Sequence, residues 1–146
     1  MPTRTARTAW NGTLEQGSGQ VELTSSRVGT YDVSFPKRAA DDAGGTTSPE
    51  ELIAAAHSSC YAMQLSAIIA EAGGTPQSLD VTADVTLGPD KANGGFAISG
   101  ITITVRGEVD GLDEAAFVKA AEAAKAGCPV SKALTGTTIT LDAGLE

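Results

Sequence analysis

The sequence predicts an α+β fold in which a long central helix packs on a mainly antiparallel sheet. Short β-rich segments with glycine-containing turns fill the first third of the chain, a long apolar run with helix start and stop signals follows, and two strands, a helix and a last strand complete it. No repeat, low-complexity tract or linker interrupts the 146 residues. We therefore expect a single domain over residues 1–146.

The first third predicts an antiparallel meander. Its strands are expected at about Thr8–Leu14, Gln20–Ser26 and Tyr31–Phe35, with a break at Gly17-Ser18-Gly19. The stretch Pro36–Thr47 lacks periodicity and is expected to be a loop that leads directly into the long helix.

The long helix begins with Ser48-Pro49-Glu50-Glu51. Ser48 suits the N-cap, Pro49 the first helical position, and Glu51 the third, so a capping box is expected and Glu50 is the carboxylate left free. The helix continues to about Glu71 and stops before Gly73-Gly74.

This helix is apolar nearly all round, which is typical of a helix at the centre of a larger assembly. Between Leu52 and Ala70 its only polar side chains are His57, Ser58, Ser59, Gln64 and Ser66. Since 146 residues hardly suffice to cover such a helix, we expect a homodimer core.

The second half predicts a pair of strands followed by helices and a last strand. The strands are expected at Leu79–Leu87 and Phe96–Val109. A bulge at Ser99-Gly100 is expected in the second strand, because it brings the apolar side chains before and after it to the same face. Asp113 can cap a helix that runs to about Ala126. The apolar stripe of this helix is formed by Phe117, Ala120, Ala121 and Ala124. A short helix is expected next at Pro129–Leu134, and a last strand at Thr137–Leu141.

The composition excludes several classes of function. The net charge of −8 and ten scattered basic residues argue against nucleic acid as a ligand. The basic N-terminus lacks the apolar stretch of a signal peptide, and we expect that no segment approaches the length and apolar character of a membrane span. The chain is therefore predicted to be cytoplasmic.

Two cysteines indicate redox chemistry. In a reducing cytosol a pair of lone cysteines is seldom a structural disulfide and more often a catalytic or redox-sensing one. Cys60 lies in an apolar run, which raises the pKa of its thiol, whereas Cys128 precedes Pro129 at a predicted helix start, which favours its thiolate. The alternative is that both are buried thiols acting as small hydrophobes.

Cys60 needs a cation to act as a nucleophile, and Arg38 is the best candidate. It lies in the loop before the helix, where Glu50 can hold its guanidinium by a bidentate pair. Ten residues separate Glu50 from Cys60, about 15 Å along a continuous helix, so either the helix breaks near Ala56–Ser59 or the parts come from two chains. The alternative is that Arg38 is a solvated loop charge and Glu50 a partner of the helix dipole.

His57 leaves two further chemistries open. A Cys60–His57 pair would favour a thiol hydrolase or acyltransferase, and Cys60, Cys128 and His57 are conceivable metal ligands, but no second histidine or CxxC spacing supports either. A hydrolase would lose activity when His57 is replaced, whereas a peroxidase should tolerate that change. A redox-inert ligand-binding dimer is the third class.

Three segments resemble the OsmC/Ohr family (osmotically induced protein C and organic hydroperoxide resistance protein). They are Gly45 to Cys60 with its P-E-E-L, Lys125 to Ser131 with its G-C-P-V-S, and the closing Ile139 to Asp142. The resemblance implies one intertwined α+β homodimer with sites at its interface. It also implies that Cys60 is the peroxidatic thiolate, Cys128 the resolving thiol, Arg38 the activating cation and Glu50 the residue that orients it.

The first-hairpin stretch Glu15–Val21 has no arginine, unlike the organic-hydroperoxide-resistance branch, so the chain resembles the OsmC branch more closely. The resemblance implies a peroxidase for organic hydroperoxides or hydrogen peroxide. Cys60 would pass through a sulfenic acid to a Cys60–Cys128 disulfide, which a dithiol reduces. No metal, flavin or haem is required.

Overall fold

The computed structural model describes residues 1–146. The chain divides into two compact units, Met1–Leu52 and Ile53–Glu146. That residues 1–146 act as one domain stays a prediction.

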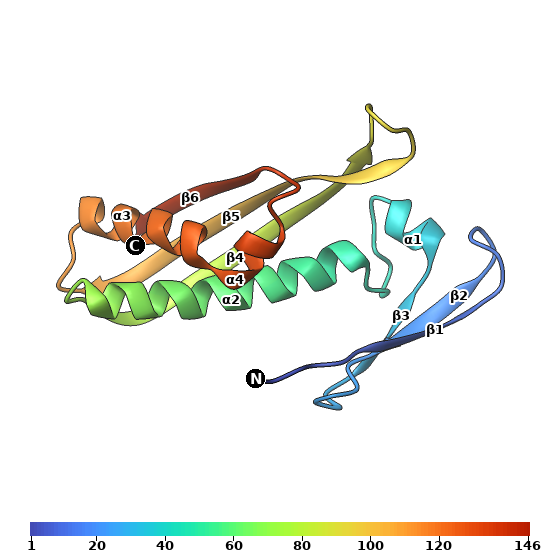
Figure 1. Cartoon of the computed structure of the whole chain (residues 1–146), viewed down its shortest axis with the longest axis horizontal. Coiled ribbons are helices and arrows are strands. Elements are labelled where there is room, and N and C mark those ends of the chain that lie inside the picture. The colour runs from blue at the N-terminus through green and yellow to red at the C-terminus, as the bar shows by residue number, and fades with distance from the viewer. The chain divides into compact units, whose positions relative to one another are not determined.

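The first unit contains a three-stranded antiparallel sheet in the order β1-β2-β3 (Figure 1). The strands are β1 (Arg7–Asn11), β2 (Ser18–Glu22) and β3 (Thr30–Val33). The predicted meander is confirmed, although the strands are shorter than expected. Trp10 lies opposite Gly19 in the register, and a Cβ atom at Gly19 would lie 2.9 Å from the Trp10 ring, so the glycine makes room for the indole.

The expectation that Pro36–Thr47 is a loop is wrong at its start. A short helix, α1 (Phe35–Ala39), begins there because the Ser34 hydroxyl accepts a hydrogen bond from the Lys37 N–H at 3.4 Å and Pro36 stands in the first turn. Proline is pre-organised for that position. The helix places Arg38 in its last turn.

The long helix, α2 (Pro49–Glu71), has the predicted bounds and no break. Ser48 caps it, since its hydroxyl accepts the Glu51 N–H at 3.1 Å. The second half of the expected capping box is wrong: the Glu51 carboxylate accepts the Thr47 hydroxyl at 2.5 Å instead. The expected break near residues 56–59 is also wrong, because the apolar run continues without a breaking residue.

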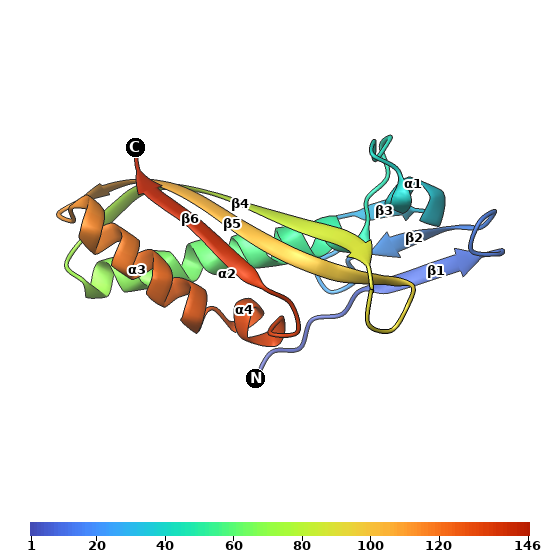
Figure 2. The same ribbon diagram turned by 90° about the horizontal axis from the view of Figure 1, so that it is seen from above.

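The second unit contains a sheet in the order β4-β5-β6 (Figure 2). Its strands are β4 (Thr75–Pro89), β5 (Phe96–Asp110) and β6 (Ile139–Leu145). Strands β4 and β5 are antiparallel, and their register shifts opposite Ser99, which confirms the predicted bulge. Strand β6 runs parallel to β5, so the chain must cross over between them, and this connection carries α3 (Glu114–Gly127) and α4 (Pro129–Ala133).

Helices α2 and α3 cover one face of this sheet, as Figures 1 and 2 show, and the core of the unit lies between. Asp113 caps α3, and the four predicted stripe residues are its buried ones. Phe117 packs so closely that a Cβ atom at Gly107 of β5 would lie 2.9 Å from its ring. The buried core comprises Tyr61, Leu65, Ile69, Ile101, Ile103, Val105, Phe117, Ala120, Ala121, Ala124 and Cys128.

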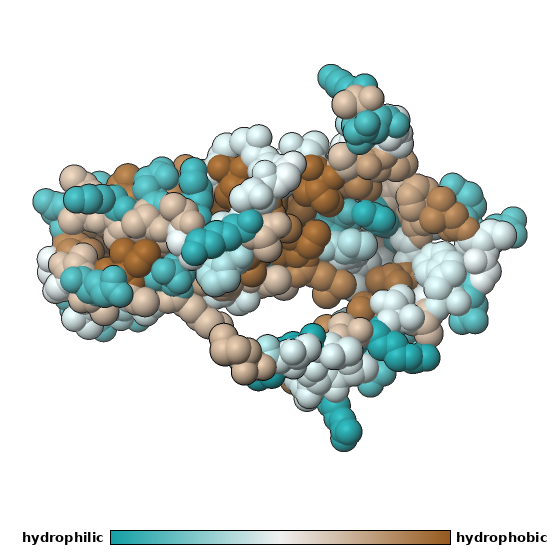
Figure 3. Space-filling model, viewed as in Figure 1, coloured by the Kyte–Doolittle hydropathy of each residue, from teal (hydrophilic) through white to brown (hydrophobic).

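One helix, α2, is long and apolar enough to cross a membrane by length and composition alone, so the expectation that no segment has this character is wrong. The core helix of a soluble protein satisfies the same criteria. Only 22% of its apolar window is buried inside the chain, and Met63 is 73% exposed. In Figure 3, apolar (brown) atoms reach the surface in the region where Figure 1 draws α2 and the strands of the second unit.

Candidate active site

The two cysteines meet in the second unit. Their sulfur atoms lie 3.2 Å apart and are hydrogen-bonded, although 68 residues separate them in the sequence. Both are free thiols; Cys128 is buried and Cys60 is partly buried. No change of fold is needed to bring these sulfurs within reach of each other.

The junction of two helices positions Cys128. Its N–H donates to the Ala124 carbonyl at 2.9 Å and so ends α3, while Cys128 is also the N-cap residue of α4. Gly127 and Pro129 on either side explain why one helix stops and another starts here. The turn directs the Cys128 sulfur toward α2, where Cys60 lies.

The two thiols are electrostatically unequal. Burial raises the pKa of the Cys60 thiol, and the neighbouring Cys128 raises it further against a hydrogen bond from the Val130 backbone. Burial also raises the pKa of Cys128, but hydrogen bonds from the Ser131 backbone, Cys60, the Ser131 side chain and the Val130 backbone outweigh burial, so the pKa of Cys128 is lowered overall. Within this unit, Cys128 is therefore the more acidic thiol, and Cys60 has no cation that favours its thiolate.

His57 does not pair with Cys60. Its Nε2 atom lies 2.7 Å from the Ser131 hydroxyl, and its Nδ1 atom is buried without a hydrogen-bond partner. Burial lowers the pKa of the His57 imidazole. The general base that a Cys60–His57 hydrolase requires is therefore not in place.

No group of three or more His, Cys, Asp or Glu side chains is arranged to hold a metal ion. Sequence reasoning missed Ser131, whose side chain is hydrogen-bonded to His57 and to Cys128. Its position three residues after Cys128, within the G-C-P-V-S segment, is the signal by which it could have been found.

The first unit contains the other two predicted residues in direct contact. The Arg38 guanidinium donates to the Glu50 carboxylate through Nε at 3.0 and 3.1 Å and through Nη2 at 2.7 Å. The Glu50 side chain is 10% exposed and that of Arg38 is 32% exposed. Because Nε and Nη2 are both held, the guanidinium is fixed in one orientation and its Nη1 remains available for another oxygen.

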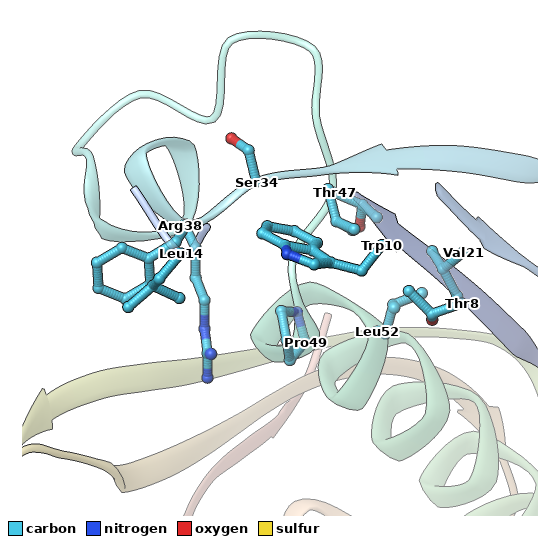
Figure 4. Close-up of a pocket in the computed structure, with 11 residues that line it drawn as sticks. Thr8, Trp10, Leu14, Val21, Ser34, Arg38, Thr47, Pro49 and Leu52 are labelled. Carbon is cyan, nitrogen blue, oxygen red and sulfur yellow. The ribbon is translucent and has the colours of Figure 1, made fainter. Parts of the chain in front are cut away.

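Arg38 also lines an apolar cavity of about 240 Å³ in the same unit. In Figure 4 the indole of Trp10 lies above Pro49 at its centre, with Arg38 and Leu14 on one side and Val21 on the other. A cation beside an apolar cavity suits a ligand with one polar end and a hydrocarbon body. The cavity is lined by Thr8, Trp10, Leu14, Val21, Val33, Ser34, Phe35, Arg38, Thr47, Pro49 and Leu52.

The four predicted site residues thus form two contacting pairs, Cys60 with Cys128 and Arg38 with Glu50. A family model described as OsmC-like protein matches residues 41–142, which include three of the four. The chain belongs to the OsmC family.

The relatives agree with this assignment. The chain is 43% identical to Peroxiredoxin OsmC of Escherichia coli (strain K12) over 137 residues, which cover 94% of this chain and 92% of the relative. The same identity and coverage hold for Peroxiredoxin OsmC of Shigella flexneri. The resemblance to the OsmC/Ohr family predicted from three short segments is confirmed.

Solved structures of the family have the same fold. The organic hydroperoxide resistance protein OhrB of Bacillus subtilis superposes with a TM-score of 0.76 at 28% identity, covering 95% of this chain and 97% of that one. An organic hydroperoxide resistance protein of Elizabethkingia anophelis gives a TM-score of 0.79 at 26% identity, covering 100% and 98%. The predicted α+β fold of the OsmC type is confirmed.

Proposed function

We propose that this OsmC-family chain is a thiol-dependent peroxidase that reduces organic hydroperoxides. The observation that carries the proposal is the 3.2 Å approach of Cys60 and Cys128 inside a packed core. The Cys60 thiolate attacks the O–O bond of the peroxide, which releases an alcohol and leaves a sulfenic acid on Cys60. Cys128 then displaces the hydroxyl group as water and forms a disulfide, which a dithiol reductant opens.

Arg38 supplies the cation that Cys60 lacks in its own unit. In this proposal its guanidinium stabilises the Cys60 thiolate and polarises the peroxide, while Glu50 holds the guanidinium in place. The contact through both Nε and Nη2 supports that division of roles, because it leaves Nη1 directed to neither carboxylate oxygen. The apolar cavity beside Arg38 supports an organic peroxide, whose hydrocarbon part would fill it.

The site is proposed to be shared by two subunits. Helix α2 is continuous from Pro49 to Glu71, and ten residues at about 1.5 Å each place Glu50 roughly 15 Å from Cys60 along its axis. An arginine held by Glu50 therefore stabilises the thiolate of the Cys60 of a partner subunit. A second copy would also cover α2, most of whose apolar window is not buried in one chain.

We further propose that the homodimer is cytoplasmic, since two unlinked thiols suit a reducing compartment, and that it requires no metal, flavin or haem. Residues 1–146 act as one domain in this proposal. The family match supports this, because residues 41–142 extend across the boundary between the two units.

A thiol titration before and after one equivalent of cumene hydroperoxide tests the function. The expected result is the loss of two thiols per chain and an intramolecular disulfide between Cys60 and Cys128, identified by peptide mass spectrometry. Cys60→Ser should abolish the consumption of peroxide. Cys128→Ser should lose one thiol and accumulate oxidised Cys60. Unchanged thiols in the native chain would exclude a peroxidase and favour a redox-inert binding protein.

A further inference from the structure

A buried chain of hydrogen bonds leads away from Cys128 and is not used by the peroxidase reaction as described above. It runs from the Cys128 sulfur to the Ser131 hydroxyl and from there to Nε2 of His57. His57 and Cys128 have no exposed surface, and Ser131 is 5% exposed. All three lie in the second unit, beside Cys60.

The unpartnered Nδ1 atom of His57 decides the direction of this chain. If Nδ1 carried the imidazole proton, a buried N–H donor would be without an acceptor. The Ser131 hydroxyl would then donate its hydrogen bond to Nε2 and could not donate to Cys128. If Nε2 carries the proton, it donates to Ser131, and the Ser131 hydroxyl remains free to donate to the Cys128 sulfur. The second arrangement stabilises a thiolate at Cys128 without placing a charge on the buried imidazole.

We propose that His57 and Ser131 form a donor chain that orients and stabilises the Cys128 thiolate for its attack on oxidised Cys60. The inference rests on the proposed peroxidase function. In this step the Cys128–Cys60 S–S bond forms and the S–O bond of the sulfenic acid breaks. The leaving hydroxide takes up the proton that the Cys128 thiol lost, so the products are one disulfide and one water.

Ser131 is the catalytic member of the chain, because it is hydrogen-bonded to the reacting sulfur. His57 is a positioning residue, since it acts only through Ser131. The lowered pKa of Cys128 agrees with donors on its sulfur, although burial opposes them. The sequence-based expectation that a peroxidase tolerates the loss of His57 therefore applies to the oxidation of Cys60 and not to disulfide formation.

Among the other ionisable groups near Cys128, the Cys60 thiol also lowers the pKa of Cys128 through its hydrogen bond, and the Cys60→Ser background of the test below removes that contribution. Cys60 and Tyr61 face Cys128 from α2, and Glu122 of α3 acts on Tyr61. The Tyr61 hydroxyl donates to the Ala121 carbonyl at 2.9 Å, and burial raises the pKa of Tyr61, so this side chain stays neutral.

A matched pair of variants at His57 tests the donor chain in the full-length protein. His57→Leu removes the donor and keeps an apolar side chain in the core, whereas His57→Gln retains an N–H group that can reach Ser131. Ser131→Ala breaks the chain at its middle, and Ser66→Ala on α2 is the control serine. In a Cys60→Ser background, the ultraviolet absorbance of the thiolate reports the ionisation of Cys128 as a function of pH.

We expect His57→Leu and Ser131→Ala to raise the pKa of Cys128 by about one unit, the effect of losing one hydrogen bond to a charged group. His57→Gln should keep the pKa of Cys128 close to its native value, and Ser66→Ala should leave that pKa unchanged. A Cys128 titration unchanged in both His57→Leu and Ser131→Ala would overturn the proposal. If His57→Leu fails to fold, Ser131→Ala decides.

A single-turnover experiment with the native Cys60 separates this inference from the function on which it rests. After one equivalent of cumene hydroperoxide, acid quenching and mass spectrometry count the sulfenic acid and the disulfide. We expect His57→Leu and Ser131→Ala to form the sulfenic acid at the native rate and the disulfide about tenfold more slowly. Equal rates of disulfide formation would refute the donor chain. The absence of both sulfenic acid and disulfide in every protein would refute the peroxidase function, and the absorbance titration would still test the chain.

Discussion

Replacing Arg38 by methionine should destabilise the first unit, because Glu50 would remain as a nearly buried carboxylate without its cation. Methionine keeps the apolar stem that lines the cavity and removes only the guanidinium. Three hydrogen bonds of 2.7 to 3.1 Å are lost, and the Glu50 side chain is only 10% exposed.

The expected cost lies between two known limits. Exposed ion pairs contribute about 0–1 kcal/mol, and breaking a fully buried pair costs about 3–5 kcal/mol. Since Arg38 is 32% exposed, we expect a loss of about 2 kcal/mol in the free energy of unfolding. With a urea m-value of about 2 kcal/mol per molar, the midpoint should fall by about 1 M.

Trp10 provides the assay. It is the only tryptophan in the chain and lines the same cavity as Arg38, so its fluorescence during urea unfolding reports on the first unit. Arg106→Met is the matched control: Arg106 pairs with Asp142 at 3.1 Å, but their side chains are 41% and 64% exposed. That change should cost less than about 0.5 kcal/mol.

A double-mutant cycle of Arg38→Met with Glu50→Gln isolates the energy of the pair. We expect a coupling above about 1 kcal/mol, and a value below about 0.5 kcal/mol would refute the reasoning that the pair is held by burial. Peroxide reduction measured on the same variants reports the proposed role of Arg38 separately. If Arg38→Met loses peroxide reduction without a change in the free energy of unfolding, the pair acts in the reaction only.

Two further predictions concern the second unit. Gly107→Ala should lower the free energy of unfolding by about 1–3 kcal/mol through overpacking against Phe117, and Phe117→Leu should recover part of the loss; additive costs in thermal unfolding would contradict the contact. Stability should also fall as the pH rises past about 10, because Tyr61 ionises there in the unfolded chain while burial raises the pKa of Tyr61 in the folded one. Tyr61→Phe should remove this decline in a pH series of urea midpoints, and a decline of the same slope in Tyr61→Phe would exclude Tyr61 as its source.

Local interactions made several elements predictable. Ser48, Pro49 and Gly73 lie within a turn of the helix ends that they define, so α2 was predicted within a residue of its bounds. The apolar stripe of α3 and the bulge at Ser99 follow from side-chain periodicity, which is a property of the chain alone. The same local reasoning failed at α1, where Pro36 signals a break as readily as a helix start.

The sequence by itself determined which residues are the candidates for the chemistry: two thiols of unequal character, one arginine before a free glutamate, and a helix too apolar to stand alone. Only the tertiary structure decided which of them meet. Cys60 reaches Cys128 across 68 residues and His57 reaches Ser131 across 74, because the crossover from β5 to β6 lays α3 and α4 against α2. Periodicity specifies the face of an element that is buried but not the residue that it faces, so the donor chain behind Cys128 appears only in three dimensions.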